Sequence, residues 1–177
     1  MDDIKYTFEQ LARLSDAKLD EIFKKGKTPD IDKLLGYEFR GYNTPVMTQL
    51  LGIRKFKKGF YMKDGKPFGY NIPVEQNGLK GEWICKPGDD NPKRFGFYSI
   101  NLPGTTSISD KEPNAALLNY GDGNNGLFEG KLLRDFVVQV YPDNPDLYLG
   151  KAYSQLGSKL IMPMFFIIER HRESDLK

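Results

Sequence analysis

Apolar positions change their spacing once along the chain, near Pro29. In the first 25 residues they recur with the 3.6-residue period of one helix face. Beyond Pro29, short runs rich in Tyr, Phe, Val and Ile are separated by Gly, Pro, Asn and Asp, which is typical of strands and turns. The sequence therefore predicts a helical N-terminal segment and then a β structure. The helical stripe consists of Phe8, Leu11, Ala12, Leu19, Ile22 and Phe23.

The helical segment contains its own start and stop signals. Ser15-Asp16 can act as a new N-cap, so the pattern allows one helix or two. Gly26 is a plausible stop, with Pro29 just beyond it. We treat the chain 1–177 as a single domain, in which 1–28 is the helical segment and 34–171 forms the β structure.

The β region predicts an antiparallel barrel. No helical stretch separates the later strands, so parallel βαβ units are disfavoured. A short Pro-initiated helix is expected at Pro45–Leu51, and Leu160–Ile168 is apolar on both faces, which favours a barrel over a sandwich. We expect a mainly β, lipocalin-like barrel of roughly eight to ten strands, with the N-terminal helix covering its outer face. The predicted strands are Leu35–Asn43, Arg54–Met62, Pro67–Val74, Gly81–Lys86, Arg94–Leu102, Ala115–Tyr120, Leu132–Tyr141, Leu147–Ser154 and Leu160–Arg170.

Composition then removes several function classes. The net charge of +2 is too balanced for a typical nucleic-acid-binding protein. One Cys and one His exclude an internal disulfide and the usual Cys/His zinc sites, so we predict no metal and no cofactor. No leader pattern and no apolar run of membrane-spanning length is visible, so we expect a cytoplasmic protein without integral membrane association. The oligomeric state stays open.

Short motifs over most of the chain resemble the bacterial GXWXG family, whose function is unknown. The first is Leu34–Gly41, in which Phe39 stands at the place of the family's Trp. The resemblance implies a calycin-like barrel with a pocket and does not imply a reaction. The other motifs are Lys55–Phe60, Leu133–Phe136, Leu149–Lys151 and Phe165–Arg170.

Polar residues embedded in apolar strands are the first candidate site. Asp135 and Gln139 share one strand face, and Lys151 and Tyr153 share a face in the next strand. If these faces point into the barrel, the four side chains form a polar patch that pairs internally or meets the polar group of a ligand. If they point outward, they are ordinary solvated positions. Arg40 and Arg134 carry the same two interpretations, and either can bind a carboxylate.

The aromatic residues are the second candidate. The chain has 12 Phe and 10 Tyr, and these rings form either an ordinary core or the lining of a cavity. The aromatic ligand-binding candidates are Tyr37, Phe39, Tyr98 and Phe166.

The leading functional hypothesis is a binding protein for a small apolar or amphipathic ligand, such as a fatty acid or another lipid-like molecule. One alternative is an enzyme on the same barrel, with Asp135 or Glu169 as an inward-facing base. Further alternatives are haem binding through His171 and a protein-interaction module. The basic run Arg54–Lys58 is interpreted as a solvated strand edge, or as a contact to phosphates or a membrane surface. Cys85 is expected to be a buried, inert thiol.

Overall fold

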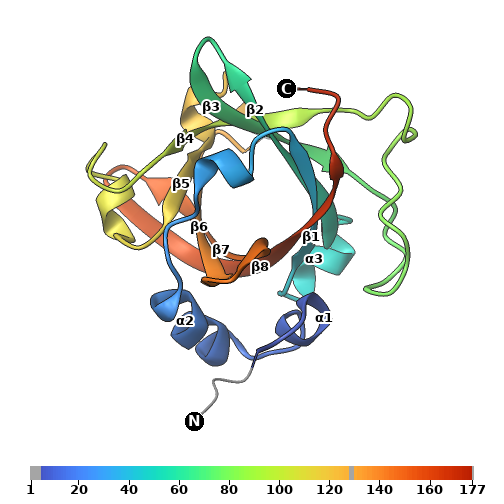
Figure 1. Ribbon diagram of the computed structural model, residues 1–177, viewed down its shortest axis with the longest axis horizontal. Helices are drawn as coiled ribbons and strands as arrows, with labels where there is room; N and C mark the ends of the chain where they lie inside the picture. The colour runs from blue at the N-terminus through green and yellow to red at the C-terminus, as the bar shows by residue number, and fades with distance from the viewer. Residues whose placement is uncertain (1–4, 128–129, 177) are drawn as a thin grey trace.

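Eight antiparallel strands close into a barrel in a computed structural model that describes residues 5–127 and 130–176 (Figure 1). Each strand pairs with its neighbours in sequence, and β1 pairs with β8 to close the sheet. This confirms the mainly β, antiparallel barrel expected from the sequence. The strands are β1 (Tyr37–Asn43), β2 (Lys55–Lys63), β3 (Lys66–Pro73), β4 (Phe95–Asn101), β5 (Ala116–Asn119), β6 (Leu133–Tyr141), β7 (Asn144–Leu156) and β8 (Lys159–Glu173).

One of the nine predicted strands is wrong. Gly81–Lys86 makes only an isolated bridge, between Val74 and Cys85, and is not part of the barrel sheet. Its alternation is real, because Trp83 and Cys85 are buried while Glu82 and Ile84 are exposed. The buried side chains pack on the outside of the barrel: the Trp83 ring lies 5.7 Å from the Phe8 ring. The alternating pattern therefore predicted correctly which side chains are buried, but it did not predict that the backbone lies outside the sheet.

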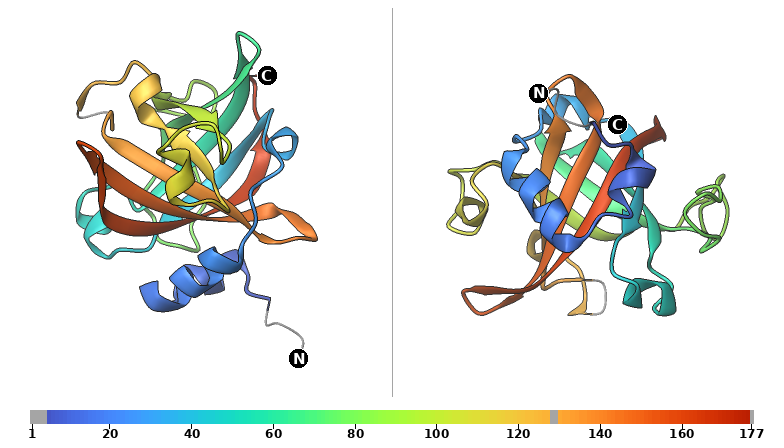
Figure 2. Two further views of the ribbon diagram at one scale, coloured as in Figure 1. Left: turned by 90° about the vertical axis from the view of Figure 1, so that its left-hand side faces the viewer. Right: turned by 90° about the horizontal axis from the view of Figure 1, so that it is seen from below.

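The N-terminal segment forms two short helices, α1 (Phe8–Leu11) and α2 (Asp16–Lys25), outside the barrel (Figures 1 and 2). Thr7 and Gln10 form a capping box at α1, and the Ser15 hydroxyl accepts from the Lys18 backbone N–H at α2. The shorter elements are α3 (Met47–Leu50), η1 (Ile31–Lys33), η2 (Ser109–Lys111) and η3 (Tyr120–Asp122). Among the helices described here, none has the length and apolar character to cross a bilayer.

Two apolar cores lie on opposite faces of the same sheet. The inner core fills the barrel and includes Phe39, Phe60 and Tyr148. The outer core lies between the sheet and the helices and includes Phe23 and Ile167. Strands β6 to β8 are buried on both faces for this reason, which explains why the final strand has apolar residues at successive positions.

Glycines on the inner face make room for aromatic rings. A Cβ at Gly150 would overlap the Phe166 ring, and a Cβ at Gly41 would overlap the Phe56 ring. Each ring therefore lies flat across a neighbouring strand, where a larger residue would push it toward the barrel axis.

We predict that Gly150→Ala lowers the free energy of unfolding by roughly 1–3 kcal/mol, because the added methyl group overpacks the inner core. Urea denaturation followed by circular dichroism measures the change. Gly88→Ala is the control, since a Cβ there meets nothing within 4 Å. Equal stability of the two variants would contradict the packing role of the Gly150–Phe166 contact.

Candidate functional site

A cavity of about 190 Å³ opens at one end of the barrel, which we call the mouth end. This end carries the β1–β2, β3–β4, β5–β6 and β7–β8 connections. Most of the cavity wall is apolar, and four of its polar side chains, Lys58, Asn71, Tyr120 and Asp135, are hydrogen-bonded to one another. The lining residues are Asn43, Gly52, Ile53, Lys55, Phe56, Lys58, Asn71, Pro73, Phe95, Tyr120, Leu133, Asp135, Ala152, Met164 and Phe166.

The rest of the interior is filled by aromatic rings in edge-to-face contact. The Phe39 ring lies 5.3 Å from the Phe60 ring and 5.6 Å from the Tyr148 ring. The Phe60 ring in turn lies 6.0 Å from the Tyr98 ring. These separations are those of well-packed aromatic pairs. The mouth cavity is therefore shallow and ends on an aromatic layer.

A buried lysine forms the centre of the polar side of the cavity. Lys58 Nζ donates to Asp135 Oδ2 at 3.0 Å, to the Tyr120 hydroxyl at 2.5 Å and to Asn71 Oδ1 at 3.0 Å. The Tyr120 hydroxyl also donates to Asp135 Oδ2 at 3.0 Å. The three N–H bonds of the ammonium group are thus all matched with acceptors, as a buried charge requires.

Aromatic rings surround this polar group. Lys58 Nζ lies 4.9 Å from the centre of the Tyr98 ring and 5.2 Å from those of Tyr120 and Phe166. Burial lowers the pKa of Lys58, and the Asp135 carboxylate opposes that effect. Burial, with the Asp135 carboxylate nearby, also raises the pKa values of Tyr98 and Tyr120 well above 10. Both phenols are therefore neutral hydrogen-bonding groups at any physiological pH.

Asp135 has one oxygen with a partner and one without. Its Oδ2 atom accepts from Lys58 and Tyr120, whereas its Oδ1 atom is buried and has no donor among the described residues. Only 4% of Asp135 is exposed. A buried carboxylate oxygen without a donor is costly, so Oδ1 is an unused acceptor within the wall of the cavity.

Half of the candidate ligand-binding residues lie on the inner face. Asp135 and Phe166 line the cavity, and Tyr98 packs beside Lys58. Phe39 belongs to the aromatic layer below, and Tyr37 packs against the inner core from farther along β1. The structure thus brings Asp135, Tyr98 and Phe166 together, and the role of each in ligand binding stays a prediction.

The other candidates lie elsewhere, so the expected patch of Asp135, Gln139, Lys151 and Tyr153 does not form. Lys151 Nζ lies 2.8 Å from Asp20 of α2, and the Tyr153 hydroxyl donates to Glu112 at 2.6 Å. Acidic partners on the covering segments hold these two side chains on the outer face.

Gln139, Arg40 and Arg134 also form their hydrogen bonds and ion pairs outside the cavity. Gln139 donates to the Tyr141 carbonyl at 2.8 Å, at the opposite end of β6. Arg40 pairs with Glu9 of α1 at 3.0 Å, and Arg134 donates to the Lys131 and Leu133 carbonyls.

Sequence reasoning missed Lys58, because the basic run was interpreted as a solvated edge. The side chains of Lys55, Lys57 and Lys58 are all buried. One signal was present: Lys58 alternates with Phe56 and Phe60, so it shares their face of β2. Tyr120 and Asn71 reach Lys58 from other strands and connections, which no local pattern indicates.

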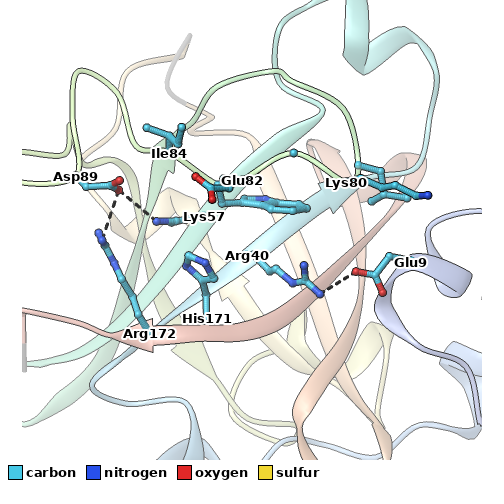
Figure 3. A pocket seen from close by; sticks show the side chains of 12 residues that line it. Glu9, Arg40, Lys57, Lys80, Glu82, Ile84, Asp89, His171 and Arg172 are labelled. Carbon is cyan, nitrogen blue, oxygen red and sulfur yellow. Dashed lines mark hydrogen bonds and ion pairs between the residues drawn. The ribbon is translucent and has the colours of Figure 1, made fainter.

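A second hollow, of about 500 Å³, lies on the outside of the barrel between α1, the 79–89 segment and β8 (Figure 3). Three of its four cations lie beside acids: Arg40 pairs with Glu9, and Arg172 with Asp89 at 3.4 Å. Lys57 Nζ lies 3.6 Å from Asp89. This outer cleft is therefore largely neutralised by its own side chains.

The outer cleft also contains the single histidine. His171 projects into it from β8, on the outside of the barrel (Figure 3). Glu169, the second candidate base, is likewise outside and pairs with Arg40. Of the two carboxylates considered as inward-facing bases, only Asp135 reaches the cavity.

Fold and cavity together define a closed eight-stranded antiparallel barrel with a small, partly polar cavity at one end. Comparison with known protein families and with curated proteins found no match for this chain. The structure shows the barrel that the resemblance to the GXWXG family implies, and the family itself stays a prediction.

The Lys58–Asp135 pair generates a stability prediction. Asp135→Leu leaves a buried ammonium unpaired and should cost about 3–5 kcal/mol of unfolding free energy. The double variant Lys58→Met/Asp135→Leu should cost less than Asp135→Leu alone, since it removes both charges. Urea denaturation tests this, with Glu21→Gln as a control on an exposed ion pair, which should change stability far less than Asp135→Leu. If the double variant instead loses as much unfolding free energy as Lys58→Met and Asp135→Leu lose together, Lys58 and Asp135 do not interact energetically.

His171 generates a pH prediction. His171 is exposed at the surface of the outer cleft, yet partial loss of hydration there, with Lys57, Arg172 and Arg40 nearby, lowers its pKa to about 4. The unfolded chain then binds more protons than the folded one between about pH 4 and 6.5, so stability falls on acidification through that window. Proton NMR of the one imidazole gives the midpoint directly.

High salt is the control for His171. High salt should raise the pH midpoint of the His171 titration only in part. It screens the neighbouring cations but does not restore the lost hydration of the imidazole. His171→Gln should flatten the stability profile in the same pH window. A midpoint near 6.5 would contradict the placement of His171.

Proposed function

We propose that the protein binds a small amphipathic molecule in the mouth cavity, with Asp135 Oδ1 accepting a hydrogen bond from its polar group. The observation that carries the proposal is this one buried oxygen without a donor beside an apolar cavity. A ligand matches both features of the site if it offers apolar surface and a donor that Oδ1 meets when the Asp135 side chain turns toward the cavity.

The size of the cavity limits the ligand. At about 190 Å³ it is smaller than the roughly 300–1,000 Å³ of typical pockets for drug-sized molecules. The aromatic layer of Phe39, Phe60 and Tyr98 blocks deeper penetration. The cavity therefore suits a small molecule, or one end of a longer lipid-like chain whose remainder leaves through the mouth.

The polar group of the ligand is a donor. Lys58 has no N–H left to offer, because Asp135, Tyr120 and Asn71 accept all three. A carboxylate ligand would meet the Asp135 carboxylate with like charge and would find no free N–H on Lys58. Among lipid-like molecules, the arrangement accordingly favours an alcohol or an amine over a fatty acid.

Apolar contact supplies most of the affinity. Each 100 Å² of ligand surface buried against rings such as Phe56 and Phe166 contributes roughly 2.5 kcal/mol before ordering costs. The hydrogen bond to Asp135 contributes mainly selectivity, since the ligand's donor exchanges a bond to water for a bond to the protein.

Isothermal titration calorimetry with 1-octanol and octanoate at neutral pH tests this function. At about 0.6 kcal/mol per non-hydrogen atom, 1-octanol should bind with a Kd on the order of 0.1 mM. Octanoate should bind roughly tenfold more weakly, because it offers no donor to Asp135.

Cavity-filling variants provide the matched comparison. Ala152→Phe places a ring in the cavity and should abolish 1-octanol binding, whereas Leu102→Phe, at the opposite end of the barrel, should leave it unchanged. If neither ligand binds, the proposed function is wrong. If octanoate binds more tightly than 1-octanol, the assignment of Asp135 as acceptor is wrong.

A further inference from the structure

The exposed apolar side chains of this protein gather at the mouth end. Of thirteen large apolar side chains that are exposed among the described residues, ten lie in or beside the β1–β2, β5–β6 and β7–β8 connections. The left view of Figure 2 shows these connections, with α3, at the same end of the barrel. The ten are Val46, Met47, Leu50, Leu51, Ile53, Leu127, Leu132, Leu156, Met162 and Met164.

Several of these side chains are mostly exposed to solvent. Leu50 is 89% exposed, and Leu156 and Met162 are each 67% exposed. They surround the cavity opening, because Ile53 and Met164 from two of the same connections line it. Apolar side chains clustered in this way mark a surface that contacts something apolar.

Charge distribution indicates what that surface contacts. The segments 39–63 and 147–168, which form β1–β2 and β7–β8 with their connections, contain Lys and Arg but no Asp or Glu. Lys131 and Lys159 are exposed at this end, and neither forms an ion pair with a carboxylate in the part of the chain described here. Exposed apolar tips flanked by cations fit a surface that lies on a bilayer containing anionic lipids, with about 1 kcal/mol contributed by each cation.

The opposite end has a different character. Its β2–β3 and β6–β7 turns carry Asp64 and Asp143, the latter paired with Lys5. Of the exposed large apolar side chains, it holds Met62 and Leu102. Exposed lysines occur at this end too, at Lys63 and Lys66, so the two ends differ in their exposed apolar side chains, which gather at the mouth end.

We propose that the mouth end docks onto the surface of a membrane containing anionic lipids. The side chains of α3 and of the β7–β8 hairpin enter the boundary between headgroups and acyl chains, while Lys131 and Lys159 contact lipid phosphates. This inference goes beyond the proposed function: it assigns a docking surface, and it places the cavity opening at the membrane, where amphipathic molecules dissolve.

Co-sedimentation with vesicles tests the docking. We expect the protein to bind vesicles of phosphatidylcholine with about 30% phosphatidylserine, and to bind pure phosphatidylcholine vesicles much more weakly. Lys159→Gln should lower the affinity about fivefold, in line with the contribution of one cation near an anionic surface. Lys63→Gln, at the opposite end of the barrel, is the matched control and should have no effect.

Apolar insertion has its own variants. Leu50→Ser/Leu51→Ser should lower vesicle affinity at least about tenfold, and Leu102→Ser should leave it unchanged. A tryptophan introduced by Leu50→Trp should be quenched by brominated lipid, while one introduced by Leu102→Trp should not. The native Trp83 is 5% exposed and contributes the same background to both.

Three outcomes would overturn the proposal. The first is binding to anionic vesicles no stronger than to pure phosphatidylcholine vesicles. The second is equal loss of binding in the mouth-end and opposite-end variants. The third is a dimer in light scattering that Leu50→Ser/Leu51→Ser converts to a monomer, since the apolar end would then contact a second copy.

Failure of docking and failure of ligand binding are distinguishable. Ala152→Phe fills the cavity but leaves the exposed surface intact, so it should retain vesicle binding. Leu50→Ser/Leu51→Ser should conversely retain 1-octanol binding in the absence of vesicles.

Discussion

Closing eight strands into a barrel leaves an interior that is only wide enough for side chains, and the rest of this structure depends on that constraint. Phe39, Phe60, Tyr98 and Tyr148 fill the middle of the barrel with edge-to-face contacts. Glycines on neighbouring strands let two further rings lie flat near the mouth. Among the described residues, the cavity that reaches Lys58 and Asp135 opens at the mouth end, so its position follows from how the rings pack.

The same narrow interior explains why the polar group beside the cavity is so completely bonded. A lysine with 3% of its side chain exposed has no access to bulk water, so its charge must be balanced inside the barrel. Asp135, Tyr120 and Asn71 provide that balance from three different parts of the sheet and its connections. A pair of this kind contributes little net stability, because desolvation offsets the attraction. What the Lys58–Asp135 pair does is fix the Asp135 carboxylate, with Oδ2 hydrogen-bonded and Oδ1 without a donor among the described residues.

The two faces of the sheet contact different parts of the protein. The outer face of β6 to β8 binds α2, and side chains such as Lys151 and Tyr153 pair with acids outside the barrel. The inner face carries the aromatic layer and the polar group. The connections at the mouth end expose apolar side chains that neither core uses. The cavity and the proposed docking surface thus share one end of the molecule.

Local sequence patterns predicted the architecture well, because burial periodicity and turn residues act over a few positions. The helix stripe, the cap at Ser15 and eight of the nine predicted strands all correspond to elements of the structure. The one that does not, Gly81–Lys86, shows what such patterns cannot predict. Its alternate side chains are buried against the outside of the barrel, but its backbone does not join the sheet.

Which face of a strand points inward was decided only by the tertiary structure. Both faces of several strands are buried, so an apolar or polar alternation looks the same whichever face lines the barrel. Lys58 and Lys151 illustrate this, since both lie on strands with apolar neighbours, yet one pairs inside with Asp135 and the other outside with Asp20. By itself the sequence determined that this chain forms strands, turns and a covering helical segment. The closure of the sheet decided which side chains meet, because contacts across the barrel join residues far apart in the chain.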